Sequence, residues 1–146
     1  MKSNYILIVI ASFTMFSCKT YTISKESFKE QFKDVNSKTL VEKKVSIISS
    51  SFVENFYCND IKTIIVEDKS GKKIEMVNRP SIEMRVTTDD NKRRIMYFDT
   101  SYIENDTLYG SQSRLLSLIN YAKIPLKRII KIEVQDGGKR YKYMNF

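Results

Sequence analysis

The stretch IEMRVTTDDNKRRIMYF, residues 82–98, decides the fold class because apolar and polar side chains alternate along both of its halves. In the first half, Ile82, Met84 and Val86 share one face of an extended chain. Residues 89–92 (DDNK) are turn-forming, and the period of two returns in the second half. The stretch therefore predicts an antiparallel β-hairpin with one buried face.

The same alternation appears on both sides of this hairpin. Residues 61–77 alternate around a DKSG turn, which predicts another hairpin. Residues 130–143 alternate around Asp136-Gly137-Gly138, where two glycines favour a primed turn, and this predicts the last hairpin. Thr107-Leu108-Tyr109 predicts a further short strand.

Helical spacing occurs at two places. Ser24 is a possible N-cap for a helix near residues 25–35, in which Ile23 and Phe28 form a hydrophobic staple. A second helix, or a covering loop, is suggested by the spacing of four apolar residues before Pro125: Leu115, Leu118, Ile119 and Ala122. Residues 39–58 fit a strand and a helix equally well, and the sequence leaves them unassigned.

These patterns together predict an α+β fold that is mainly β. We expect a short N-terminal helix followed by antiparallel hairpins that form a small sheet or a barrel-like domain. The chain is expected to divide into a signal peptide at residues 1–17, a tether with the short helix at residues 18–38, and a β-rich globular domain at residues 39–146.

The N-terminus has the pattern of an export signal. Lys2 gives a short positive region, and residues 6–16 (ILIVIASFTMF) are apolar but too few to span a bilayer as a helix. The sequence Met15-Phe16-Ser17-Cys18 that follows resembles the lipobox of bacterial lipoproteins, in which a small residue precedes an obligatory cysteine. Met15 and Phe16 depart from the usual pattern, whereas Ser17 and Cys18 match it. An ordinary secretory signal and an uncleaved anchor are the alternatives.

The resemblance implies cleavage after Ser17 and a diacylglycerol on the Cys18 sulfur, with acyl chains such as palmitate holding the mature protein on a membrane. Lys19-Thr20-Tyr21 lacks the aspartate that resembles an inner-membrane retention signal in some Gram-negative bacteria. The implied location is therefore the cell envelope, most simply the outer membrane facing the periplasm. By composition the chain also resembles small uncharacterised lipoproteins of Bacteroidota.

The chain is basic, with 25 Lys and Arg against 17 Asp and Glu. Removal of residues 1–17 takes away one charge, that of Lys2, and leaves the mature chain at +7. The candidate polyanion-binding residues are those beside two predicted turns: Lys92, Arg93, Arg94, Lys139 and Arg140. The alternative is an ordinary solvated surface. Nucleic acid is not expected as a partner of an exported protein.

The composition excludes several kinds of catalytic site. The chain has no His, which removes Ser-His-Asp and Cys-His nucleophile systems and His-ligated metal sites. Its four glycines cannot form a P-loop or a dinucleotide fingerprint. A carboxylate pair remains possible for a glycosidase, from residues that lie close in sequence: Asp89, Asp90, Asp99, Glu104 and Asp106. We expect these to be mainly turn formers, and we expect no cofactor, no metal and no catalytic residue.

Cys58 is the other cysteine of the chain, and we expect it to be a buried, unreactive thiol because its neighbours are Phe56 and Tyr57. The leading functional hypothesis is a lipid-anchored, non-enzymatic envelope protein that serves as a binding or assembly module for a protein partner. The first alternative is a binder of an anionic envelope glycan or lipid through the basic turns and tyrosines. The second alternative is a carboxylate-dependent hydrolase.

Overall fold

The structure is a computed structural model that describes residues 19–47, 52–115 and 120–144. The predicted signal segment, including Cys18, lies outside these residues. The elements, in chain order, are β1 (Thr20–Thr22), α2 (Lys25–Phe32), β2 (Val41–Ser46), β3 (Val53–Cys58), β4 (Thr63–Glu67), β5 (Lys73–Val77), β6 (Ile82–Thr88), β7 (Arg93–Tyr97), the 3-10 turn η2 (Phe98–Thr100), β8 (Tyr102–Glu104), β9 (Thr107–Ser111), β10 (Tyr121–Pro125), η3 (Leu126–Arg128), β11 (Ile129–Asp136) and β12 (Lys142–Tyr143).

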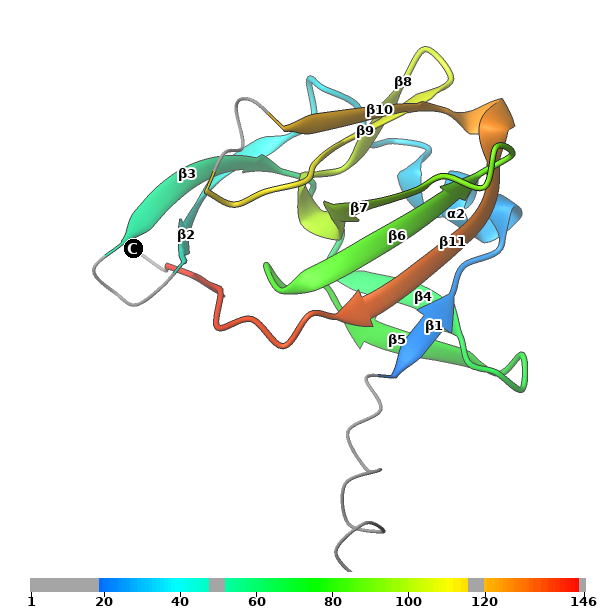
Figure 1. Cartoon of the computed structure of the whole chain (residues 1–146). Coiled ribbons are helices and arrows are strands. Elements are labelled where there is room, and N and C mark those ends of the chain that lie inside the picture. Colours follow the sequence, from blue (N-terminus) through cyan, green and yellow to red (C-terminus); the bar gives the residue numbers. More distant parts are fainter. Residues whose placement is uncertain (1–18, 48–51, 116–119, 145–146) are drawn as a thin grey trace, which may run out of the picture.

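The largest sheet has six strands in the order β5-β4-β1-β11-β6-β7 (Figure 1). The hairpin predicted over residues 82–98 is confirmed as β6 and β7, with Met84 opposite Met96. The hairpin over residues 61–77 is confirmed as β4 and β5. All strand pairs are antiparallel, as expected. Within the described residues the sheet ends at β5 and β7, so it does not close into a barrel.

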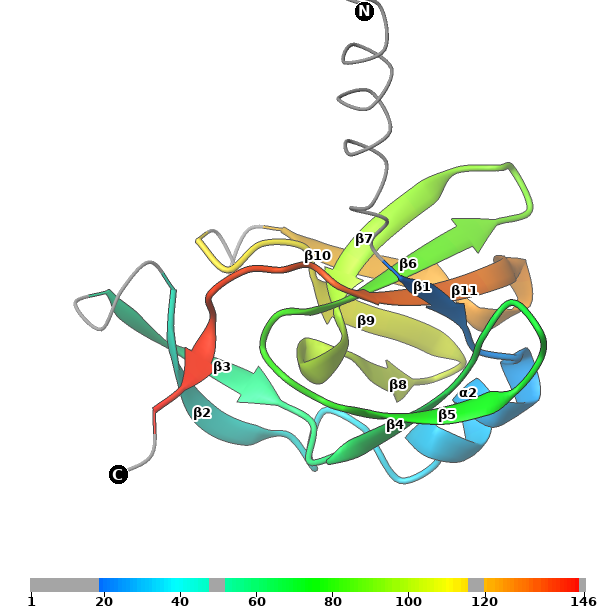
Figure 2. The same ribbon diagram turned by 90° about the horizontal axis from the view of Figure 1, so that it is seen from below.

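The last predicted hairpin is wrong. Strand β11 lies inside the large sheet, paired with β1 on one side and with β6 on the other. Both edges of β11 are therefore occupied, and Tyr143 cannot pair back onto it. The chain instead crosses to another sheet, where β12 pairs with β2, as the red segment in Figure 2 shows. Alternation alone gave the strands correctly but not their partners, because the pairing depends on long-range contacts.

Gly137 lets this crossing segment pass close to β6. Its backbone N–H donates to the Ser81 carbonyl at 3.0 Å. A Cβ atom at Gly137 would lie 2.9 Å from the Glu83 carboxylate and 3.2 Å from the Ser81 carbonyl oxygen. The glycine is thus required by a close approach of two backbones rather than by a hairpin turn.

Two three-stranded sheets complete the fold, in the orders β10-β9-β8 and β12-β2-β3. The unassigned residues 39–58 supply β2 and β3, and the predicted strand at Thr107 is confirmed as β9. Tyr121 and Ala122 begin strand β10, so the helix suggested over residues 115–122 is wrong there; residues 116–119 are not described. Ala122 and Ile124 are buried on one face of β10 and pair with β9, a period of two that the helical spacing had obscured.

Helix α2 covers one end of the large sheet. The Ser24 hydroxyl accepts from the Ser27 backbone N–H at 3.2 Å, and the helix ends at Phe32, inside the range 25–35 expected from the sequence. The Gln31 side chain exchanges two hydrogen bonds with the Ile65 backbone, at 2.9 and 3.0 Å, and so ties the helix to β4. Among the residues described, no helix is long and apolar enough to cross a membrane.

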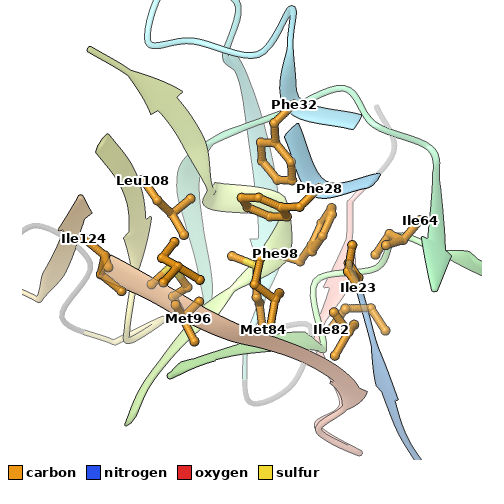
Figure 3. Close-up of a cluster of buried hydrophobic side chains, with 14 of the residues drawn as sticks. Ile23, Phe28, Phe32, Ile64, Ile82, Met84, Met96, Phe98, Leu108 and Ile124 are labelled. Carbon is orange, nitrogen blue, oxygen red and sulfur yellow. The ribbon is translucent and has the colours of Figure 1, made fainter. Parts of the chain in front are cut away.

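One hydrophobic core joins the helix to the large sheet and to β9 and β10 (Figure 3). Phe28 and Phe32 of the helix lie with ring centroids 4.6 Å apart, and Phe32 meets Phe98 edge to face at 5.2 Å. Ile23, before the helix, belongs to the same core. The segment predicted as a tether therefore contributes to the main core. A smaller core lies between the β12-β2-β3 sheet and the body: Val45, Ile47, Phe56 and Cys58.

Replacement of Phe32 by Ala tests whether the helix belongs to the core. We expect Phe32→Ala to lower the free energy of unfolding of the chain by about 3–5 kcal/mol, because a fully buried aromatic ring is lost. Chemical denaturation followed by circular dichroism measures this change. Lys29→Ala on the exposed side of the same helix is the control and should change stability little. Equal stability of the two variants would mean that the helix is only loosely attached.

Candidate anion-binding groove

The five basic residues predicted to bind a polyanion lie at opposite ends of one pair of strands. Arg93 and Arg94 pair with the last residues of β6, next to the β6–β7 turn that holds Lys92. Lys139 and Arg140 follow the end of β11, which lies beside Ile82 at the start of β6. Figure 1 shows the β6–β7 turn and the red segment after β11 on opposite sides of the molecule. The structure therefore does not bring the five residues together.

Two cations near the β6–β7 turn, Lys92 and Arg128, face local carboxylates, whereas Arg93 and Arg94 have no side-chain ion pair or hydrogen bond among the described residues. Lys92 lies 3.4 Å from the Asp90 carboxylate. Arg128 contacts Asp89 at 2.9 Å and Asp90 at 3.2 Å. A hydrogen bond from Thr88, with smaller contributions from Lys92 and Arg128, holds the pKa of Asp90 well below its ordinary value, so this carboxylate is ionised at neutral pH. Asp89 and Asp90 thus offset the charges of Lys92 and Arg128, which weakens the attraction of these two cations for an external anion.

The cations at the other end of β6 line a groove. Lys139 and Arg140 are joined there by Arg79, from the β5–β6 connection, and by Lys142 of β12. The groove has a volume of about 1000 Å³. Its remaining lining comes from Ser46, Ser81, Asp136, Gly138, Tyr141 and Met144. The sequence gave no signal for Arg79 or Lys142, because they are 63 positions apart along the chain and only the crossing of the chain to β2 brings them together.

Lys139 is held in place and forms a wall of the groove. Its Nζ donates to the Glu83 carboxylate at 2.5 Å and to the Tyr97 hydroxyl at 2.9 Å, and it lies 5.2 Å from the centroid of the Tyr97 ring. Partial burial disfavours the charged form, but the hydrogen bonds to Glu83 and Tyr97 outweigh it and raise the pKa of Lys139 above its ordinary value. Lys139 therefore stays charged, and its charge is matched by Glu83.

Arg79, Arg140 and Lys142 differ from Lys139, because they are exposed and their side chains have no hydrogen bond or ion pair among the described residues. Among the described residues that line the groove, Asp136 is the one carboxylate, and it accepts a hydrogen bond from the Gly138 backbone N–H at 3.0 Å. The groove therefore carries a surplus of positive charge with free N–H donors. Arginine in particular presents a planar fork that matches a carboxylate or a phosphate.

Strand β12, which brings Lys142 to the groove, is held by a buried polar junction. The junction consists of Asp99, Arg114, Tyr143 and Cys58. Asp99 of η2 accepts from Arg114 at 2.5 Å, and both side chains are fully buried. Its other oxygen accepts from the Tyr143 hydroxyl at 2.7 Å, with the Cys58 sulfur at 3.7 Å. Burial, followed by the Asp99 charge, raises the pKa of Tyr143 far above its ordinary value, so the hydroxyl stays protonated and donates. This bond holds β12, and with it Lys142, at the groove.

The carboxylates that lie close in sequence do not form one site. Asp89 and Asp90 face Arg128, Asp99 is buried against Arg114, and the Glu104 carboxylate accepts from Ser37 at 2.5 Å. Asp106 lies in the β8–β9 turn. Among the described residues there is also no group of three or more Cys, Asp or Glu side chains placed to hold a metal ion. Each carboxylate thus has its own structural setting.

Comparison with protein-family models, with curated proteins and with solved structures finds no match to this chain. A functional assignment therefore depends on the geometry of the groove and on the resemblance of the N-terminal segment to a lipobox.

Cys58 gives a direct test of the buried junction. Burial, followed by the Asp99 charge, raises the pKa of the Cys58 thiol to about 12. With that pKa only about one thiol in ten thousand is ionised at about pH 8. We expect a disulfide reagent to label Cys58 far more slowly in the folded chain than in the unfolded chain, because the folded thiol is buried and almost entirely protonated. In denaturant the reaction should go to completion. Rapid labelling of the folded chain would show that the junction is open to solvent.

Proposed function

We propose that this chain is a lipid-anchored, non-enzymatic binding module of the bacterial cell envelope, and that its groove binds phosphate or carboxylate groups of an anionic envelope glycan or lipid. The observation that carries the binding part of the proposal is the set of three exposed and unpaired cations, Arg79, Arg140 and Lys142, in one groove. The lipid anchor on Cys18 follows from the lipobox resemblance alone.

The concave shape and the positive charge of the groove together favour an anion as the ligand. Exposed cations on a convex surface are well solvated and screened, and each contributes little to binding. Cations that line a concave surface act on the same ligand, and the low-dielectric walls strengthen their combined field. Tyr141 beside them offers an apolar ring face and a hydroxyl, which suits a sugar or a headgroup.

A protein partner is a second candidate, and strand β3 is the observation that favours it. Within the described residues β3 is the edge of its sheet, and it carries exposed apolar side chains. Val53 is 38% exposed and Tyr57 is 64% exposed, and Phe52, just before the strand, is 41% exposed. An edge strand with unpaired backbone groups and exposed aromatic residues is a common contact surface for another chain.

The anchor is tested by Cys18→Ala. We expect this variant to lose labelling by palmitate and to remain as the uncleaved precursor, because the acylated sulfur is the substrate of the maturation steps implied by a lipobox. Metabolic labelling followed by gel analysis measures both effects. Cys58→Ala is the matched control and should label and mature normally. Continued acylation and normal maturation of Cys18→Ala would refute the lipoprotein assignment.

The groove is tested by two charge reversals of equal size, made in residues 19–146. We expect Arg79→Glu/Arg140→Glu/Lys142→Glu to weaken binding to an anionic ligand by about tenfold or more, because three like charges face one bound group. Lys92→Glu/Arg93→Glu/Arg94→Glu changes the net charge equally at the opposite end of β6 and should weaken binding much less. Added salt should weaken the binding of the unmodified domain.

Two ligands separate the possible sources of the anion. Vesicles that contain phosphatidylglycerol test a lipid headgroup, with phosphatidylcholine vesicles as the neutral control, and a soluble polyuronate tests an acidic glycan. Equal losses from the two triple variants would mean that net charge, and not the groove, attracts the ligand. If neither ligand bound to the unmodified domain in a salt-sensitive way, the anion proposal would fail and the protein-partner candidate would take its place.

A further inference from the structure

A second cavity lies at the other end of β11 from the groove, between helix α2, the β8–β9 turn and η3. Its volume is about 620 Å³, within the range of small-molecule sites. Phe28, Ile129 and Ile132, which belong to the main core, form an apolar floor, and Leu126 adds to it. Phe28 is 1% exposed and Ile129 and Ile132 are each 2% exposed, whereas Leu126 is half-buried, so the cavity reaches only the edge of the core.

Three lysines surround this apolar floor. Lys25 and Lys29 come from α2, and Lys127 comes from η3 on the opposite side. All three are exposed, and their side chains have no ion pair or hydrogen bond among the described residues. In the part of the chain that the structure describes, Asp106 is the one carboxylate that lines the cavity. The rim thus carries a surplus of positive charge over an apolar interior.

Of the two helical lysines, Lys25 is placed unfavourably for the helix, whereas Lys29 lies in the last turn, where the helix dipole favours a cation. They are four residues apart and share one face, where like charges repel each other. Lys25 is also the first residue of α2, where the helix dipole disfavours a cation. Glu30 pairs with Lys33, and Glu26 in the first turn forms no ion pair with either lysine among the described residues. A bound anion between the lysines would relieve both penalties at once.

The far wall of the cavity is a rigid turn. Asn105 and Asp106 both have positive φ, at 48° and 54°, as in the primed turns that connect antiparallel strands. The Asp106 carbonyl accepts from the Leu126 backbone N–H at 2.9 Å, which fixes the turn to η3. Because both walls are tied to the sheet, the cavity does not depend on a loop closing over it.

We propose that this cavity binds a single-chain anionic amphiphile, a free fatty acid, with the carboxylate among Lys25, Lys29 and Lys127 and the acyl arm along Phe28, Leu126 and Ile129. Charge complementarity decides the occupant. The acyl chains of a lipid anchor on Cys18 would be linked as uncharged esters and would leave the lysines unpaired. A peptide would not need an apolar floor ringed by cations.

Photolabelling of the full chain in a non-ionic detergent tests the proposal, with lauric acid that carries a diazirine at its terminal carbon as the probe. We expect labelled peptides from α2 and from the segment of η3 and β11, located by mass spectrometry, and we expect excess unmodified lauric acid to compete. The corresponding alcohol, which has the same apolar arm and no charge, should label these peptides roughly tenfold less, because the charge-assisted contacts are lost.

Two sets of variants shift the labelling in opposite directions. Lys25→Gln/Lys29→Gln/Lys127→Gln should lower the labelling at these peptides about fivefold to tenfold. The matched control Lys69→Gln/Lys72→Gln/Lys73→Gln makes the same charge change at the β4–β5 turn and should leave labelling unchanged. Asp106→Asn removes the one repulsive carboxylate, keeps a residue type that tolerates positive φ, and should increase labelling.

The lysine variant is expected to fold, because its changes lie on the surface and remove an unfavourable charge from the helix start; thermal unfolding checks this. Label that is not displaced by lauric acid, equal labelling by the alcohol, or unchanged labelling of the lysine variant would each overturn the proposal. Labelling spread over the exposed strand β3 would assign the probe to a different apolar surface and would also overturn it.

Discussion

The buried ion pair between Asp99 and Arg114 is the constraint on which the arrangement of the sheets depends. Asp99 follows β7 of the large sheet, and Arg114 follows β9 of a second sheet. The other Asp99 oxygen accepts from Tyr143 of β12, in the third sheet, and Arg114 also donates to the Pro80 carbonyl just before β6, at 2.9 Å. A buried ion pair is tolerated only when further hydrogen bonds satisfy both of its charged groups. Because those hydrogen bonds come from different sheets, few other arrangements of the strands would satisfy the pair.

Aromatic rings around the ion pair stabilise the part of the Arg114 side chain that has no hydrogen bond. The Arg114 guanidinium lies 4.8 Å from the Phe56 ring centroid and 4.3 Å from that of Tyr97, and its Nε and Nη1 have no hydrogen-bond partner among the described residues. Contact with two aromatic faces stabilises a desolvated cation. Loss of either member would leave the other as an unpaired buried charge, which typically costs about 3–5 kcal/mol. The junction is therefore a source of specificity more than of stability.

This junction also determines where one group of cations comes together on the surface. It fixes β12 beside β2, and the segment between β11 and β12 then passes over the start of β6 and creates the basic groove. The fatty-acid cavity lies at the other end of β11, where α2 and η3 meet. In both places several cations have no carboxylate partner among the described residues, although Lys139 in the groove pairs with Glu83. Near the β6–β7 turn, Lys92 and Arg128 pair with Asp89 or Asp90, whereas Arg93 and Arg94 have no such partner among the described residues.

The sequence by itself determined the elements whose signal is local. The period of two located β4 to β7, β9 and β11, because one buried face of a strand needs no knowledge of its partner. Ser24 and the apolar stripe after it located the helix for the same reason. Tertiary structure alone decided that β11 lies inside the sheet, that Tyr121 begins a strand, and that Arg79 and Lys142 join Lys139 and Arg140 while Lys92 does not. Those outcomes depend on which edges remain free after other strands have paired and on how buried charges are satisfied, and neither is written in the spacing of residues along the chain.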